Sequence, residues 1–251
     1  MQSHHLSNRH EFALYAPCID SWGIVSQGNE RVIDDEALCL RIHRVLRLHE
    51  HEMVQLFGTL YNIVGELVVV QAHRCILKVM ACNVITPLKP RIQLALPLIE
   101  KSAFEEAVSW ATILGVEKIT PYIAAKSKRH EFAHSEMQRL MRVMIAAAEQ
   151  SKQYSLPTIG SVVPFAHISH QDSMLIAFDI RGGNICRVMQ AVELSKRERV
   201  TVLCGPEGDW ASDERNMLIS WGASMSRLTP TILRTEHAIA VGIGVLRSLW
   251  S

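Results

Sequence analysis

The chain has 251 residues, of which 48% are hydrophobic and 20% are charged, a composition that excludes intrinsic disorder, a fibrous repeat and a disulfide-stapled miniprotein. Its 26 basic and 25 acidic residues give a net charge of +1, so bulk charge neither requires nor excludes an anionic partner. No apolar stretch reaches the roughly 18 to 20 residues of a membrane span. The N-terminus is polar and the six cysteines include no CxxC pair, so we expect a cytoplasmic protein without disulfides, metal or membrane contact.

The first eighty-odd residues are predicted to be mostly β-strand. A helical stretch near residues 35–48 precedes three apolar runs rich in Val, Ile and Leu, which are separated at spacings typical of hairpins. The runs span residues 53–57, 63–70 and 75–81. We therefore expect a small β-barrel or sandwich over residues 1–85. The prolines at 87 and 90 indicate a linker after it, because proline interrupts hydrogen-bonded ladders.

From residue 91 onward, short apolar runs alternate with helical segments. Strands are predicted at residues 91–98, 117–122, 158–163, 174–178, 200–204 and 224–228. Helices are predicted at residues 103–114, 133–150, 212–221 and 235–250, with Gly115 closing the first of them. Gly182 and Gly183 are predicted to form a turn. The alternation favours an α/β domain over residues 86–251, built on a mostly parallel sheet with both faces covered.

Ligands of such sheets bind at the carboxyl ends of the strands, in the loops that lead into helices. The chain has neither a GxGxxG fingerprint nor a P-loop, so the loops after Cys204 and Leu228 are the predicted site. In the first loop, Gly205 and Gly208 allow the backbone to approach a ligand closely. Glu207 lies between them. It either accepts a hydrogen bond or a proton from a ligand, or it is a solvated carboxylate in a tight turn.

The second loop contains a proline and leads into the helix predicted at 235–250. Thr235 can cap that helix, and Glu236 lies in its first turn, where the helix dipole favours a negative charge. These structural roles leave Arg234 unexplained. A guanidinium just before a helix N-terminus would help to hold an anion.

Motifs in these two loops resemble a known family. Gly-Pro-Glu-Gly at 205–208 with Glu214, and Ile-Leu-Arg-Thr-Glu at 232–236, resemble the signature motifs of the 16S rRNA uridine-N3 methyltransferase family. That family belongs to the SPOUT superfamily of knotted methyltransferases. Weaker matches follow in the expected order over nearly the whole chain, at residues 44–48, 56–58, 114–116, 119–121 and 148–151.

The resemblance implies a fold, a cofactor and partners. A PUA-like β-barrel that binds RNA would occupy residues 1–85, and a SPOUT α/β domain with a C-terminal deep trefoil knot would occupy residues 86–251. The family acts as a homodimer on 16S rRNA or the small ribosomal subunit, and it binds S-adenosylmethionine in the knotted loops. The positions that match its cofactor pocket are Leu203, Cys204, Gly205, Gly208, Leu228, Thr229, Pro230, Ile232 and Leu233.

The resemblance also implies a chemistry for the polar residues of the loops. The N3 position of uridine is a weak acid whose neutral form is a poor nucleophile, so methyl transfer requires that its proton leave. Glu207 or Glu236 would accept the proton directly or through water. Arg234 would hold a phosphate, or a uracil carbonyl on which negative charge develops. These three are the expected catalytic residues.

Several positions depart from the family pattern. Asp209 and Thr229 stand where the family has glycine, His237 replaces a small hydroxyl residue, and Lys152 and Gln153 replace Gly-Arg. Each change touches the expected surroundings of the cofactor or the substrate. Two alternatives therefore stay open: a SPOUT enzyme with a different RNA target, and a catalytically impaired dimer that only binds RNA.

Local basic clusters are the candidate RNA contacts, because the charge is unevenly distributed. Residues 1–85 hold 7 basic and 9 acidic side chains, whereas the remainder holds 19 and 16. Arginines at 41, 44 and 47 recur at a spacing that predicts one helical face. The candidate RNA-binding residues are Arg44, Arg47, Lys126, Lys128, Arg129 and Arg142. A solvated surface is the alternative for each cluster.

Overall fold

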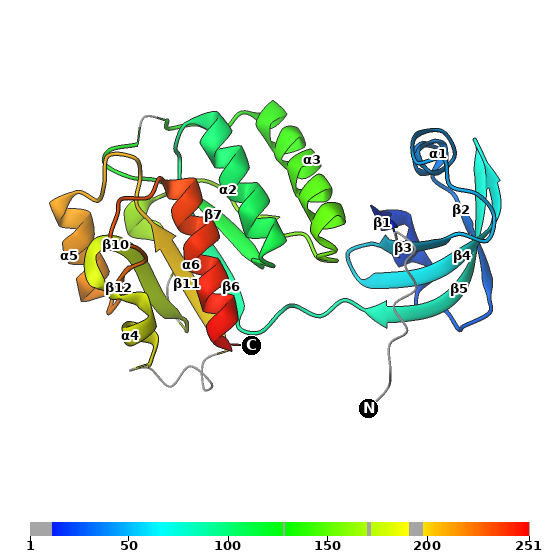
Figure 1. Cartoon of the computed structure of the whole chain (residues 1–251). Helices are drawn as coiled ribbons and strands as arrows, with labels where there is room; N and C mark the ends of the chain where they lie inside the picture. Colours follow the sequence, from blue (N-terminus) through cyan, green and yellow to red (C-terminus); the bar gives the residue numbers. More distant parts are fainter. Residues whose placement is uncertain (1–11, 128, 170–171, 191–197, 251) are drawn as a thin grey trace. The chain divides into compact units, whose positions relative to one another are not determined.

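The structure is a computed structural model that describes residues 12–127, 129–169, 172–190 and 198–250. The chain divides into two compact units, Met1–Thr86 and Pro87–Ser251 (Figure 1). Each unit has a hydrophobic core of its own.

The N-terminal unit is a five-stranded sheet with the strand order β1-β3-β4-β5-β2. Its strands are β1 (Phe12–Tyr15), β2 (Glu30–Ile33), β3 (Met53–Phe57), β4 (Tyr61–Gln71) and β5 (Arg74–Val84). The three predicted apolar runs form β3, β4 and β5, which pair antiparallel as predicted. The short strands β1 and β2 extend the sheet, β1 parallel to β3 and β2 antiparallel to β5.

The helix predicted over residues 35–48 is shorter in the structure. Helix α1 (Glu36–Leu40) continues into a π-helical turn (Arg41–Val45) and ends there. Arg47 lies beyond it with a left-handed φ of 54°, so it does not share a helical face with Arg44. The expectation of a basic stripe along one helix is therefore wrong.

A carboxylate fixes the turn between β3 and β4. Asp20 accepts hydrogen bonds from the backbone N–H of Thr59 at 2.7 Å, from its hydroxyl at 2.6 Å and from the N–H of Leu60 at 3.0 Å. This approach requires Gly58, because a Cβ there would lie 2.3 Å from Asp20 Oδ1. Burial raises the pKa of Asp20, but the hydrogen bonds outweigh burial and hold that pKa below its usual range.

The C-terminal unit is built on a seven-stranded sheet with the order β12-β10-β11-β6-β7-β8, and β9 also pairs with β7. All its described strand pairs are parallel, which confirms the predicted α/β class. The strands are β6 (Arg91–Pro97), β7 (Lys118–Ile123), β8 (Thr158–Ile159), β9 (Val163–Pro164), β10 (Met174–Asn184), β11 (Arg199–Cys204) and β12 (Ser224–Arg227).

Five α-helices and one short 3-10 helix (Phe165–His167) are described in this unit. The α-helices are α2 (Lys101–Ile113), α3 (His134–Ser151), α4 (Ile185–Gln190), α5 (Ser212–Ser220) and α6 (Thr235–Trp250). Helix α2 lies between α3 and α6 on one side of the sheet (Figure 1). Arg247 of α6 donates hydrogen bonds to the carbonyls of Leu114 at 2.9 Å, Gly115 at 2.7 Å and Pro90 at 2.7 Å. Gly115 ends α2 with a φ of 66°, as the sequence predicts.

Two predicted elements differ in the structure. In place of the strand predicted at 158–163 there are two short strands, β8 and β9, and residues 160–162 between them are not strand. Gly182 and Gly183 lie within β10, and the prediction of a turn there is wrong. A Cβ on Gly182 would lie 2.5 Å from backbone atoms of Met225, so this glycine allows β10 and β12 to approach closely.

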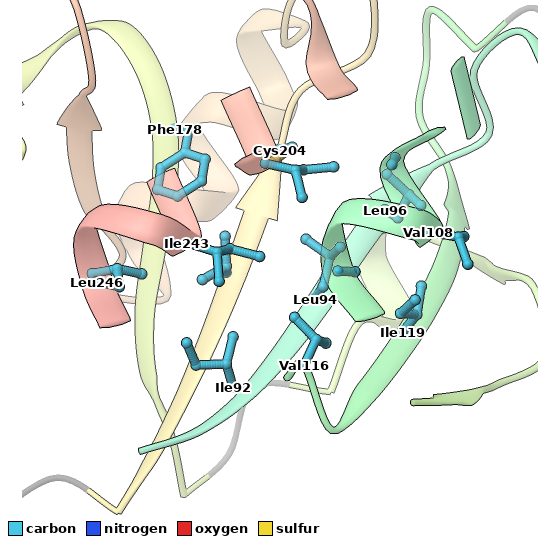
Figure 2. Packing of buried hydrophobic residues seen from close by; sticks show 14 of the residues in the cluster. Ile92, Leu94, Leu96, Val108, Val116, Ile119, Phe178, Cys204, Ile243 and Leu246 are labelled. Carbon is cyan, nitrogen blue, oxygen red and sulfur yellow. The ribbon is translucent and has the colours of Figure 1, made fainter. Parts of the chain in front are cut away.

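Alternate residues of the central strands face two different cores. Figure 2 shows the larger core, in which Leu94 and Leu96 of β6 and Cys204 of β11 pack with Ile243 and Leu246 of α6. The intervening residues of the same strands face the smaller core on the opposite side of the sheet. Burial of both faces explains why the later parts of these strands, Leu-Ala-Leu at 94–96 and Val-Leu-Cys at 202–204, contain no polar residue.

The described residues include no helix that is long and apolar enough to cross a membrane. All six cysteines are free thiols. Within the described ranges, no group of three or more His, Cys, Asp or Glu side chains is arranged to hold a metal ion.

Candidate functional site

A cavity of about 900 Å³ lies at the carboxyl ends of β11 and β12, beside residues 178–180 in the middle of β10. The loops after β11 and β12 line it, together with the first turns of α2 and α6. Its lining residues are Glu100, Ser102, Ala103, Glu106, Phe178, Asp179, Ile180, 204–209, Ser226, Leu228, Thr229, 231–236 and Ala238. The volume lies within the range of small-molecule sites, roughly 300 to 1,000 Å³.

Most of the residues expected to bind a cofactor meet at this cavity. Those that line it are Cys204, Gly205, Gly208, Leu228, Thr229, Ile232 and Leu233. Leu203 does not, because its side chain alternates with that of Cys204 and packs in the core on the other face of the sheet. Pro230 belongs to the second loop but is not among the lining residues.

Three side chains fix the backbone of the first loop. The hydroxyl of Tyr122, which is fully buried, donates a hydrogen bond to the carbonyl of Cys204 at 2.6 Å. Thr235 Oγ1 donates to the carbonyl of Gly205 at 2.9 Å, and Lys126 Nζ donates to the carbonyl of Gly208 at 2.8 Å. These three hydrogen bonds hold the loop in place.

Thr235 therefore has a different role from the predicted helix cap. Helix α6 begins at this residue, and its hydroxyl donates to the first loop instead of accepting a hydrogen bond from a helical N–H. This contact joins the two loops that line the cavity. The cap prediction failed because it considered only the local sequence.

Four charged side chains form a network beside the cavity. Asp179, with a side chain only 1% exposed, is ion-paired with Arg215 and accepts the backbone N–H of Arg181 at 2.8 Å. Arg215 also reaches Asp209 Oδ2 at 3.2 Å, and Arg181 reaches the same oxygen at 3.0 Å. Asp209 has a left-handed φ of 62°, which explains why glycine suits this position. Two guanidinium groups therefore compensate the charge that Asp209 adds.

The three expected catalytic residues also line the cavity, but they differ in exposure. Glu207 and Arg234 are exposed, whereas Glu236 is 5% exposed. Glu236 lies in the first turn of α6, and its carboxylate has no hydrogen-bond or ion-pair partner among the described residues. His237 next to it is exposed and does not line the cavity.

Sequence reasoning missed the contributions of β10 and α2. Phe178, Asp179 and Ile180 line the cavity from β10, and Glu100 and Glu106 line it from the start of α2. Asp179 directly follows the apolar run 174–178, so the rule about carboxyl ends of strands could have found it. The residues of α2 gave no signal, because nothing local distinguishes them from a solvated helix.

The candidate RNA-binding residues are dispersed. Lys126 is bound to the first loop, and Arg129 is ion-paired with Glu136 at 2.8 Å and donates to the carbonyl of Ile99 at 3.2 Å. The guanidinium of Arg129 is thus used within the fold. Arg142 of α3 is exposed, as are Arg44 and Arg47 of the N-terminal unit. Lys128 lies outside the described residues.

Comparison with protein families gives one match that spans most of the C-terminal unit. The model of the RNA methyltransferase domain matches residues 86–247. The chain is also 28% identical over 168 residues to the ribosomal RNA small subunit methyltransferase E of Rickettsia conorii. That alignment covers 65% of this chain and 66% of the relative, so the chain spans about two thirds of the relative's length.

Two solved structures share the fold over almost the whole chain. The first is a ribosomal RNA small subunit methyltransferase E from Neisseria gonorrhoeae bound to S-adenosyl methionine, with a TM-score of 0.76 and 22% identity. The second is a Legionella pneumophila protein in complex with the cofactor SAM, with a TM-score of 0.78 and 18% identity. Each comparison covers 96% of this chain and 98% of the other.

Proposed function

Because the RNA methyltransferase domain matches residues 86–247, the chain belongs to the RNA methyltransferase family, and we propose that it methylates N3 of a uridine in 16S rRNA with S-adenosylmethionine. The observation that carries the proposal is the cavity in which both signature loops meet. The small-subunit enzyme name of the Rickettsia relative and the bound cofactor of the Neisseria structure support this substrate and this cofactor.

The residues of the cavity fit such a cofactor. Gly205 and Gly208 leave backbone groups accessible, and Phe178, Leu228 and Leu233 offer apolar surface for an adenosyl group. When bound, S-adenosylmethionine supplies a methyl group on a sulfonium centre. The hydrogen bonds that fix the loop reduce the ordering that a ligand would otherwise have to impose.

Exposure distinguishes the two candidate proton acceptors. We assign the removal of the N3 proton to Glu207, because its exposed position at the rim is accessible to an RNA base. Arg234 is also exposed at the rim, and it would stabilise the negative charge that develops on the uracil carbonyls. Glu236 lies deeper and suits contact with the cofactor better than contact with a macromolecule.

The finer features of the family complete the proposal. The N-terminal unit would be the PUA-like RNA-binding domain, with the exposed Arg44 and Arg47 among its contacts. The C-terminal unit would hold the deep trefoil knot, and the contact of Thr235 with Gly205 supports a close passage of the two loops. The enzyme would act as a homodimer in the cytoplasm, where its rRNA is.

Two measurements test the proposal. Mass mapping of 16S rRNA from a deletion strain, complemented with the wild-type gene, should reveal one uridine that carries N3-methylation only when the gene is present. Strains complemented with Glu207→Gln or Arg234→Ala should lose most of that modification. Full methylation by both variants would refute the assigned roles, and a modification at another base would indicate a different RNA target.

Calorimetric titration of the full chain with S-adenosylmethionine distinguishes an enzyme from a scaffold. Binding at a stoichiometry of one ligand per chain is expected. A folded protein that binds no S-adenosylmethionine would instead favour a dimer that only binds RNA.

A further inference from the structure

Glu236 is the one acidic lining residue that combines deep burial with the lack of a partner among the described residues. The residue is 5% exposed and lines the cavity, yet no donor or cation within the described ranges reaches its carboxylate. The nearby Arg234 forms no ion pair in those ranges either. No oxygen of a described side chain is fully buried without a hydrogen bond, so water of the cavity reaches this carboxylate, and a ligand that fills the cavity would displace that water. Its partner is therefore expected to come from whatever occupies the cavity.

The other acidic side chains of the cavity show the contrast. Asp179 and Asp209 are ion-paired with arginines. Glu100 accepts the backbone N–H groups at the start of α2 at 3.0 and 3.3 Å, and Glu106 accepts a hydrogen bond from Trp110 Nε1 at 3.4 Å. Glu207 is exposed to solvent. Among these lining residues, Glu236 alone combines an exposure of 5% with a carboxylate that no described residue pairs with or donates to.

We propose that Glu236 is the counter-charge of the cofactor's sulfonium and makes the cavity prefer the charged methyl donor over its neutral product. The proposal rests on the proposed function and deepens it. A sulfonium carries a positive charge without N–H groups, so a single carboxylate among apolar side chains is enough to compensate it. The lining offers such surroundings in Phe178, Leu233 and Ala238.

This role differs from that of a general base. Glu236 would lose its counter-charge when the sulfonium becomes a neutral thioether, so it would favour release of S-adenosylhomocysteine. A base acts on the RNA and would leave the relative affinities of donor and product unchanged. Binding measurements without RNA therefore separate the two roles.

The test is a calorimetric titration of the full chain with three ligands. They are S-adenosylmethionine, neutral S-adenosylhomocysteine, and sinefungin, which carries an ammonium group in place of the methylsulfonium. The wild type should bind both cationic ligands about tenfold or more tightly than the neutral product. Glu236→Gln preserves size and should bring the three affinities to within about threefold of one another. Glu105→Gln removes the same charge from an ion-paired position of α2 that does not line the cavity, and it should retain the preference.

Each other outcome overturns the proposal. A wild type that binds the neutral product as tightly as the donor refutes it without any variant, so the test stands even if Glu236→Gln fails to fold. If Glu236→Gln weakened the binding of all three ligands equally, the carboxylate would contact a group that the three ligands share and not the sulfonium. If the folded wild type binds none of the three, the proposed function fails together with this inference.

Discussion

Replacing Arg215 with methionine should destabilise the C-terminal unit strongly, because it leaves the buried Asp179 without its ion pair. The side chain of Asp179 is 1% exposed and that of Arg215 is 17% exposed. Removing one member of a buried pair costs about 3 to 5 kcal/mol. The backbone N–H of Arg181 still reaches Asp179 at 2.8 Å, so we expect the lower end, about 3 kcal/mol. That corresponds to a fall in Tm of roughly 6 to 12 °C for a unit of this size.

Urea unfolding followed by tryptophan fluorescence measures this change. Four of the five tryptophans lie in the C-terminal unit, so the signal reports mainly on that unit. Arg181→Met is the matched control, since its ion pair with Asp209 is exposed and should contribute about 0 to 1 kcal/mol. Adding Asp179→Leu to Arg215→Met should restore much of the loss by removing the unpaired charge. A loss below about 1 kcal/mol for Arg215→Met would refute the argument from burial.

Three further predictions concern packing, loop position and pH. A Cβ on Gly242 would lie 2.2 Å from the ring of Phe178, so Gly242→Ala should destabilise the unit by about 1 to 3 kcal/mol in urea unfolding and weaken cofactor binding in calorimetry. Gly244 has open space around it, so Gly244→Ala is the control and should be neutral or stabilising. Tyr122→Phe removes the hydrogen bond to the carbonyl at the end of β11 and should cost about 1 to 3 kcal/mol, with a raised Kd for the cofactor. An unchanged Kd would show that the loop does not need this bond. The lowered pKa of Asp20 stabilises the N-terminal unit above the carboxyl's unfolded pKa, and this stability is lost as pH falls through the folded value. Melting curves between about pH 5 and pH 2 should show that loss, and Asp20→Asn should show less of it.

Hydrophobic pattern was sufficient to predict most of the sheet elements. The runs 53–57 and 200–204 became β3 and most of β11, because long apolar runs in this chain are buried strands. Pattern failed where strands are short or where another strand dictates the conformation. The strand predicted at 158–163 is instead two strands of two residues each, 158–159 and 163–164. Gly182 lies within β10, where β12 passes so close that a Cβ would clash with the backbone of Met225.

The sequence was sufficient to predict which two loops form the candidate site. Family motifs located those loops, and the domain match over residues 86–247 confirms the resemblance. The roles of single residues depended on contacts across the fold. Nothing local reveals that Lys126 reaches the carbonyl of Gly208, or that Arg129 is held by Glu136 instead of facing solvent. Distances between residues far apart in sequence decide such roles, and a single sequence does not contain them.

Phe178 belongs both to the larger hydrophobic core and to the lining of the cavity. A ligand in the cavity therefore stabilises the C-terminal unit by mass action, in proportion to its concentration relative to its Kd. The N-terminal unit has a separate core, and no residue that lines the cavity belongs to it. In one thermal scan, the Tm of the C-terminal unit should rise as the ligand fills the cavity. The Tm of the N-terminal unit would serve as the internal reference for that rise.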